Sequence, residues 1–200
     1  MIDRINQTIR VLHSGGAVLI ATDTVYGLAA LPDDEAAVAK IYALKARPKH
    51  MFLPVMVAGI DDLEALGLDV NANARKLLAS HLAPGALTFV LGFRDGATKP
   101  HWAKTREEIA VRIPDNALLL SVLRATGPLL VTSANRHGRQ ATPARVEVIV
   151  KELCGAPDLI VEDGEGREIP STIVNCRCNP PVTERIGTVS DETIRNILAQ

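Results

Sequence analysis

The chain has 200 residues, of which 47% are hydrophobic and 22% charged, and its formal net charge is -1. This composition is typical of a soluble globular protein with an aliphatic core, since only 3% of the residues are aromatic, and it excludes an overall basic surface for nucleic acid. Residues 1–14 carry Asp3, Arg4 and Arg10 and lack the long apolar run of a signal peptide or a membrane helix. We therefore expect a cytoplasmic protein with no membrane partner.

Apolar periodicity and turn residues predict alternating helices and strands in the N-terminal half of the chain. The expected elements, in chain order, are a helix that carries Ile5, Ile9 and Leu12, a strand over 17–21, a helix from Asp33 or Asp34 to just before Pro48, a strand over 55–57, helices over 60–66 and 71–82, and a strand over 87–91.

The C-terminal half opens with a polar stretch over 92–106, which we expect to be an exposed loop able to act as a lid. The elements expected after it are a strand over 109–113, a helix over 117–125, a strand over 129–132, a helix over 146–153, strands over 159–161, 172–174 and 182–186, and a last helix capped by Ser190. Because the last strands are consecutive, the predicted fold is α/β, a single domain over 1–200 with a twisted mixed parallel and antiparallel sheet flanked by helices.

Three cysteines are present, which is an odd number without a paired C-x-x-C arrangement. The sequence therefore predicts buried, reduced thiols and neither a disulfide framework nor a four-ligand zinc site. A metal held by Cys176, Cys178 and a distant histidine is the less favoured alternative.

The common phosphate-loop, dinucleotide, serine-hydrolase and metalloprotease signatures are absent from the sequence. Polar residues lie instead where strands and helices are predicted to end, and open α/β sheets bind their ligands at such ends. The first such cluster is the segment Asp23-Thr-Val-Tyr-Gly27 after the first strand, for which a simple turn is the alternative.

A second cluster, Lys45-Ala-Arg47-Pro-Lys49, places three cations in five residues beyond a helix. This density suits a triphosphate, although a solvated helix end that complements the helix dipole is an equal alternative. A third signal is Arg112, which lies inside an otherwise apolar strand where an unpaired charge would cost several kcal/mol. Arg112 therefore needs an anion, either a structural carboxylate or a carboxylate or phosphate of a substrate.

Hydrogen-bonding groups also leave a buried strand at Thr132-Ser133-Ala-Asn135-Arg-His137-Gly138. A loop cap competes with a functional role here. Ser133 and His137 invite a nucleophile-and-base hypothesis, but no oxyanion elbow accompanies them, so hydrolase chemistry is disfavoured. Ser171, Thr172 and the late Arg185 are weak signals on their own.

In order and spacing, these motifs together resemble the YrdC-like family across nearly the whole chain. The resemblance implies a twisted mixed sheet around a concave basic cavity. It also implies a synthase that makes threonylcarbamoyl-AMP and pyrophosphate from L-threonine, bicarbonate and ATP with Mg²⁺, for the N6-threonylcarbamoyladenosine modification of tRNA. Proteins of the tRNA-modification machinery that receive the labile product are implied partners.

The same resemblance implies roles for individual residues. The catalytic group would be Lys45, Arg47, Ser133 and Asn135. ATP would be bound by Lys45, Arg47, Lys49, Ser133, Asn135 and Arg185, and threonine by Thr24, Tyr26, Arg112, Ser171 and Thr172. No metal is expected to be held by protein side chains alone.

The chain departs from the pattern of this family at several positions. Better-studied two-domain members have an asparagine where Met51 stands and a histidine where Met56 stands, and hydroxyls are expected at Glu108, Val131 and Ala141. Two alternatives therefore remain at this point: a module that binds tRNA or double-stranded RNA without catalysis, and a paralogue that adenylates another carbamoylated small molecule.

Overall fold

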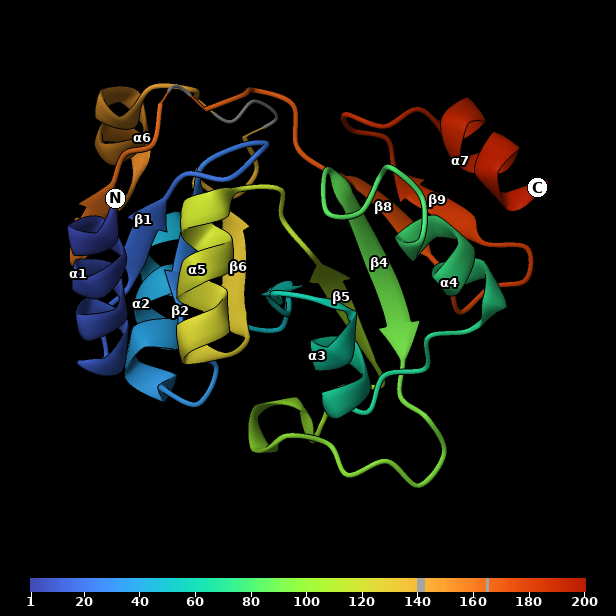
Figure 1. Ribbon diagram of the computed structural model, residues 1–200. Helices are drawn as coiled ribbons and strands as arrows, with labels where there is room; N and C mark the ends of the chain where they lie inside the picture. The colour runs from blue at the N-terminus through green and yellow to red at the C-terminus, as the bar shows by residue number, and fades with distance from the viewer. Residues whose placement is uncertain (140–142, 165) are drawn as a thin grey trace.

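A computed structural model describes residues 1–139, 143–164 and 166–200 of the chain (Figure 1). Its elements are α1 (Ile2–His13), β1 (Val18–Ile20), β2 (Gly27–Ala30), α2 (Glu35–Lys45), β3 (Val55–Met56), α3 (Ile60–Ala65), α4 (Ala72–Leu78), β4 (Leu87–Gly92), the 3-10 helix η1 (His101–Ala103), β5 (Glu108–Arg112), α5 (Ala117–Thr126), β6 (Leu129–Ser133), α6 (Val146–Glu152), β7 (Leu159–Val161), β8 (Thr172–Asn175), β9 (Val182–Arg185) and α7 (Asp191–Leu198).

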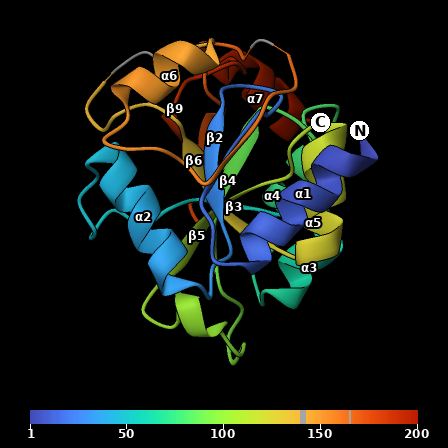
Figure 2. The same cartoon turned by 90° about the vertical axis from the view of Figure 1, so that its left-hand side faces the viewer.

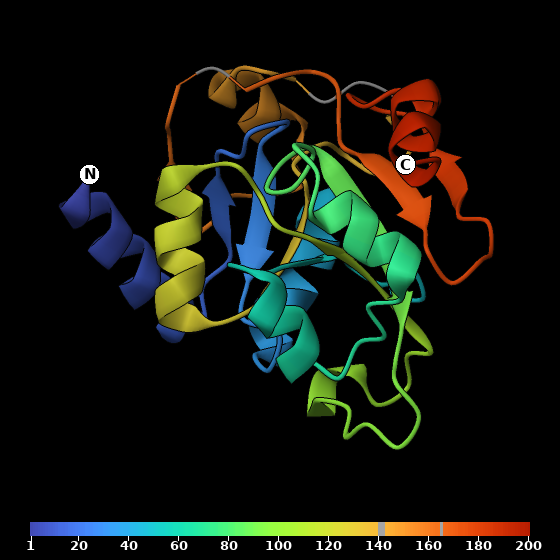
Figure 3. The same ribbon diagram turned by 45° about the vertical axis from the view of Figure 1, so that its right-hand side comes forward.

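Nine strands form one sheet in the order β7-β1-β2-β6-β3-β5-β4-β8-β9. The sheet contains parallel pairs, such as β3 with β5 and β4 with β8, and antiparallel pairs, such as β2 with β6 and β4 with β5. The predicted α/β fold with a mixed sheet is thereby confirmed. Figure 2 shows α1 and α5 on one side of the strands β2 and β6 and α2 and α6 on the other, while Figure 3 shows α7 beside α4.

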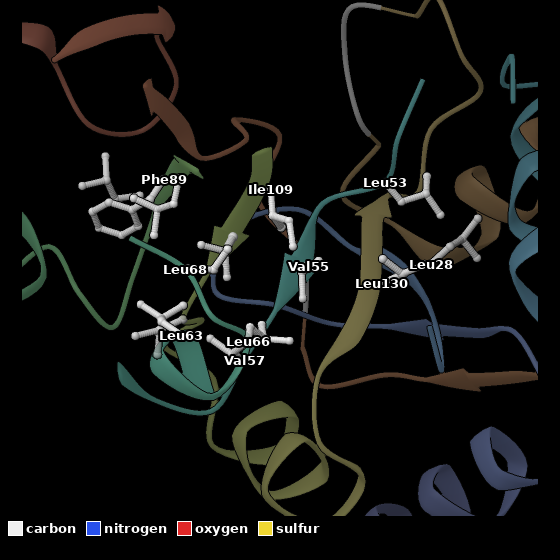
Figure 4. Close-up of a cluster of buried hydrophobic side chains, with 14 of the residues drawn as sticks. Leu28, Leu53, Val55, Val57, Leu63, Leu66, Leu68, Phe89, Ile109 and Leu130 are labelled. Atoms are coloured by element: carbon white, nitrogen blue, oxygen red, sulfur yellow. The ribbon is translucent and has the colours of Figure 1, made fainter. Parts of the chain in front are cut away.

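Two apolar clusters cover the two faces of the sheet. Successive residues of a strand point to opposite faces, so Leu130 of β6 packs in the larger cluster, with α2 and α4, and Val131 packs in the smaller one, with α1 and α5. Figure 4 shows part of the larger cluster, where Leu28, Val55 and Leu130 come from three different strands. The step from Leu130 to Val131 therefore crosses from one face to the other.

Most predicted elements are present, but the strand β2 was not predicted. Three of its four residues, Gly27–Ala30, are glycine or alanine, and none is β-branched or aromatic, so the usual strand signal is absent. β2 is nevertheless buried between β1 and β6. A Cβ on Gly27 would lie 2.6 Å from the Cγ1 of Val131, so the close approach of β2 to β6 requires glycine at this position.

Two further segments differ from the prediction. The predicted helix over 71–82 ends at Leu78, because the hydroxyl of Ser80 donates to the carbonyl of Leu77 and the chain then turns. The polar stretch over 92–106 contains η1, whose Trp102 is half-buried. Among the described residues, none of the helices has both the length and the apolar character needed to cross a bilayer.

Candidate active site

A cavity of about 270 Å³ opens on the face of the sheet that carries Met56 and Val131, and three arginines line it. We call it the arginine cavity. Its lining residues are Thr22, Thr24, Val25, Tyr26, Gly27, Arg47, Phe52, Pro54, Met56, Thr88, Ala110, Arg112, Val131, Thr132, Ser133, Pro170, Ser171, Ile173 and Arg185. Seven of the predicted site residues are among them: Thr24, Tyr26, Arg47, Arg112, Ser133, Ser171 and Arg185.

Strand register brings these residues together from distant parts of the sequence. Met56 of β3 is the partner of Arg112 in β5, and Gly27 of β2 is the partner of Ser133 at the end of β6. Thr88 of β4 is the partner of Ile173 in β8. The cavity is thus built across the middle of the sheet, with the polar groups at or near strand ends.

Arg112 is buried, with 4% of its surface exposed, and it has a carboxylate partner. Its Nη2 lies 2.7 Å from Asp23, its Nη1 donates to the hydroxyl of Thr24 at 2.7 Å, and its Nε donates to the carbonyl of Gly85 at 2.8 Å. Burial lowers the pKa of Arg112, and Asp23 opposes this effect. Of the two anions left open by the sequence, the structure therefore contains the structural carboxylate, while the guanidinium still lines the cavity.

Arg47 and Arg185 line the cavity without a carboxylate partner among the described residues. Arg47 donates to the carbonyls of Met51 and Phe52, at 3.1 and 3.2 Å, and Arg185 donates to the carbonyl of Ser171 at 2.7 Å. Burial lowers the pKa of both guanidinium groups, and the nearby charge of Arg112 lowers the pKa of Arg185 further. Such like charges facing one cavity favour a ligand with several negative charges.

Lys45 is buried and does not line the arginine cavity. Its Nζ donates to the carbonyls of Ser133 and Asn135, the latter at 2.6 Å, and lies 3.3 Å from Oδ1 of Asn135. Burial, and then the charge of Arg47, lower the pKa of Lys45 to about 7. Between the two cations, Ala46 adopts a left-handed conformation with φ 48°. The geometry therefore places Lys45 to hold the turn after β6, and Arg47 in the lining of the cavity.

The turn after β6 is internally hydrogen-bonded. Ser133 Oγ donates to Oδ1 of Asn135 at 2.6 Å, and Nδ2 of Asn135 donates to the carbonyl of Arg139 at 3.0 Å. His137 contacts Lys45 through its backbone N–H, and no Ser133–His137 hydrogen bond occurs in the described part of the chain. A nucleophile-and-base pair therefore has no support here, and Ser133 reaches the cavity while Asn135 orients it.

The predicted threonine-binding residues divide in the same way. Thr24, Tyr26 and Ser171 line the cavity, although the Tyr26 hydroxyl donates to the carbonyl of Gly164 at 2.6 Å. Thr172 has no exposed surface and does not line the cavity. Its hydroxyl donates to the carbonyl of Val189 and accepts from two backbone N–H groups, so it is saturated by the protein.

Lys49 and the residues at which the chain departs from the family pattern do not gather at one site. Lys49 lines a different cavity, on the other face of the sheet. Met56 and Val131 line the arginine cavity, Met51 is exposed beside it and offers its carbonyl to Arg47, and Glu108 pairs with Arg177 at the surface. Ala141 lies outside the described residues.

Two hydroxyl residues of the cavity, Thr22 and Thr88, were not predicted, and Thr132 was part of a predicted cluster but was given no role. Thr88 is buried in β4, where its hydroxyl lies 2.8 Å from that of Ser171. The available signal was a threonine inside an apolar strand, the same kind of anomaly that singled out Arg112. In the described residues no group of three or more His, Cys, Asp or Glu could hold a metal ion, so the Cys176–Cys178 alternative has no support.

Comparison with known proteins gives consistent matches over this chain. A family model named Sua5_yciO_yrdC, with the description "Telomere recombination", matches residues 10–187. The chain is 34% identical to a threonylcarbamoyl-AMP synthase of Bacillus subtilis over 98% of its own length, and 29% identical to one of Pyrococcus abyssi over 94%. It covers 56% and 55% of those two proteins, about half their length.

Solved structures show the same relationship. The structure of P. abyssi Sua5 complexed with L-threonine matches with a TM-score of 0.85 and 29% identity, over 96% of this chain and 56% of that one. E. coli YciO matches with a TM-score of 0.81 and 27% identity, over 93% of this chain and 90% of that one. The similarity therefore spans the sheet, the arginine cavity and the elements that build it.

Proposed function

Because this chain belongs to the Sua5/YciO/YrdC family, we propose that it is a threonylcarbamoyl-AMP synthase, which transfers the AMP group of ATP to the carbamate formed from L-threonine and bicarbonate. The observation that carries this proposal is the arginine cavity, where three guanidinium groups and several hydroxyls converge. The product would serve the N6-threonylcarbamoyladenosine modification of tRNA in the cytoplasm.

The amino acid is proposed to bind beside Arg112. The hydrogen bonds of this guanidinium to Gly85 and Thr24 use two of its five N–H groups, and its Nη2 is ion-paired with Asp23. The remaining donors suit the threonine carboxylate. Thr24 and the Thr88–Ser171 hydroxyl pair lie in the same wall and would orient the amine and the side chain.

The reaction asks mainly for positioning and charge neutralisation. Bicarbonate takes up a proton and loses water to give carbon dioxide, and the neutral threonine amine adds to the carbon dioxide and releases a proton, which gives the carbamate. A bond then forms between a carbamate oxygen and the α-phosphorus of ATP, and the bond from the α-phosphorus to the bridging oxygen breaks, so that pyrophosphate leaves. Arg47 and Arg185 would neutralise the phosphate charges, and Ser133, held by Asn135 and Lys45, would orient the nucleotide.

The volume of the arginine cavity limits which parts of the two substrates can lie inside it. A volume of about 270 Å³ is just below the usual range of ligand pockets, and it suits an amino acid and the reacting phosphate better than a whole nucleotide. We therefore place the rest of ATP outside the cavity, beyond Arg47 and the turn after β6. Exclusion of water from the reaction centre when both substrates are bound would also protect the carbamate.

Magnesium is proposed to arrive with the ATP phosphates as part of the substrate, since the described residues contain no carboxylate or histidine cluster to hold it. When bound there, the ion neutralises phosphate charge and favours departure of pyrophosphate. The protein would contribute the guanidinium groups that complete this neutralisation.

Release of pyrophosphate tests the proposed function. Purified protein with threonine, bicarbonate, Mg²⁺ and ATP is expected to release pyrophosphate, and omission of any one component is expected to stop it. Release that continues without threonine would reject the threonine-specific reaction. A screen of other amino acids then tests whether Met56 and Val131, which make this wall apolar, change the preferred side chain.

A further inference from the structure

A second cavity, of about 720 Å³, lies on the opposite face of the sheet from the arginine cavity. Leu130 lines it, whereas the next residue, Val131, lines the arginine cavity. α2 forms one wall, and η1 with the residues that follow it forms another; Figure 2 shows η1 beside the N-terminal end of α2. We call it the tryptophan cavity, after Trp102, the one tryptophan of the chain.

The wall opposite α2 contains a buried cation with few partners. Arg106 is 6% exposed, its Nη1 donates to the carbonyl of Leu53 at 3.0 Å, and its Nε has no hydrogen-bond partner. Its guanidinium carbon lies 4.6 Å from the ring centre of Phe52 and 5.3 Å from that of Trp102. Within the described residues no carboxylate pairs with it, although a buried charge is normally paired. Arg106 therefore presents an unsatisfied preference for an anion at the cavity wall.

The charges of the tryptophan cavity are separated along α2. Lys49 and Tyr42 lie with Arg106 towards the C-terminal end of the helix, and the carboxylates of Asp33 and Glu35 lie at its N-terminal end. Glu35 and Tyr42 are two helical turns apart, roughly 10 Å along the axis. A ligand that fits must therefore be anionic at one end and carry hydrogen-bond donors at the other.

We propose that the tryptophan cavity binds a nucleoside monophosphate whose base carries an amino group. The phosphate would contact Arg106 and Lys49, the base would pack against Trp102, and its amino group would donate to Asp33 or Glu35. In a nucleotide such as AMP the phosphate and the base amine lie at opposite ends of the molecule, and aromatic side chains stack on bases of any kind. A free nucleotide and an unpaired nucleotide of RNA share this chemistry.

Fluorescence of Trp102 tests the proposal directly, because no other tryptophan contributes. AMP is expected to change the emission saturably, while adenosine and ribose 5-phosphate, each lacking one half of the recognition, are expected to bind at least about tenfold more weakly. A single-stranded oligoadenylate that binds more tightly than AMP would identify RNA as the source, and one that binds more weakly would identify the free nucleotide. Equal binding of adenosine and AMP, or no saturable change with AMP, overturns the proposal.

Variants assign the signal to this cavity. Lys49→Gln and Asp33→Asn change exposed side chains at the two ends, and each is expected to weaken AMP binding about tenfold. Lys104→Gln, at an exposed position between Trp102 and Arg106 that does not line the cavity, is the matched control and should bind AMP normally. Arg106→Gln is expected to give the largest loss of AMP binding. If this variant does not fold, Lys49→Gln and Asp33→Asn test the proposal without it.

Binding in the arginine cavity must be kept apart from this signal. Arg47→Gln is expected to leave the AMP-dependent change of Trp102 fluorescence intact, since Arg47 lines only the arginine cavity. Loss of the change in Arg47→Gln would assign it to the arginine cavity and overturn the proposal. The fluorescence assay does not depend on pyrophosphate release, so a failure of the proposed synthase activity would leave its outcome unaffected.

Discussion

The end of β5 and the end of α2 each bury a cation, and the two cations are held differently. Arg112 is paired with the carboxylate of Asp23 and still lines the arginine cavity. Lys45 is held by the neutral oxygens of Ser133 and Asn135 and lies behind the cavity wall. Both residues were predicted to bind substrate. The difference teaches that two buried cations predicted for similar roles can be placed differently: one lines the cavity, and the other stabilises the turn beside it.

Removing the carboxylate of Asp23 is expected to have the largest effect. Asp23→Ala leaves the charge of Arg112 buried and unpaired, and we expect a loss of about 3–5 kcal/mol in the free energy of unfolding. Urea denaturation followed by circular dichroism measures it. The exposed Asp95→Ala is the control and should lie within about 0.5 kcal/mol of the parent. A loss below about 1 kcal/mol for Asp23→Ala would show that Arg112 does not depend on this pair.

Removing the charge of Arg47 is expected to separate ligand binding from stability. Arg47→Gln should lower kcat/KM for pyrophosphate release about a hundredfold, or about 2.7 kcal/mol, with a change of stability under about 1 kcal/mol. The exposed Arg94→Gln serves as the control for loss of one positive charge. If Arg47→Gln retained full activity, the contrast between Arg47 and Lys45 would be wrong.

The lowered pKa of Lys45 is expected to make the stability of the protein depend on pH. Its pKa of about 7 in the folded protein lies below the ordinary 10.5, so between these values the unfolded chain binds a proton that the folded chain lacks. The free energy of unfolding should therefore rise with pH in this window, by up to about 1.4 kcal/mol per pH unit. Urea denaturation at pH 7, 8 and 9 gives the free energy of unfolding of the parent and of Lys45→Met. The difference between the two curves removes the contribution of other titratable groups. Parallel curves would contradict the prediction.

A substitution at Ala46, between Lys45 and Arg47, is expected to have the smallest effect on stability. Ala46 has a left-handed conformation that costs an L-residue about 1 kcal/mol and costs glycine little. Ala46→Gly should therefore raise the free energy of unfolding by up to about 1 kcal/mol. Ala43→Gly, at an exposed position inside α2, should lower it by about the same amount. A decrease in both variants would mean that the turn is not strained.

Sequence periodicity predicted most of the helices and strands, but it could not predict which side chains pair with one another. Apolar spacing predicted most helices and strands, and it failed for β2 because Gly-Leu-Ala-Ala lacks the side chains that mark a strand. The anomaly of a charge inside an apolar strand correctly identified Arg112 as a residue that needs an anion. Its partner Asp23 could not be chosen, since that choice depends on strand order.

The candidate site shows the same limit. Arg47, Ser133 and Arg185 reach the arginine cavity, while Lys45, Lys49, Asn135 and Thr172 do not line it, although all were drawn from the same short motifs. Residues one or two positions apart can face opposite sides of a strand or turn, and sequence spacing alone does not say which side carries the ligand. The environment of Arg106 was missed because its loop has no periodicity.

The hydroxyl of Thr172, which makes three hydrogen bonds, fixes the C-terminal part of the chain to the sheet. It holds the backbone of Gly187 and Val189 against the first residue of β8, with three hydrogen bonds at one oxygen. These three bonds fix the segment that follows β9 against the start of β8. The same contacts help to hold Arg185, the partner of Ile173 in β8, beside the cavity. They also connect α7, which begins two residues after Val189, to the sheet.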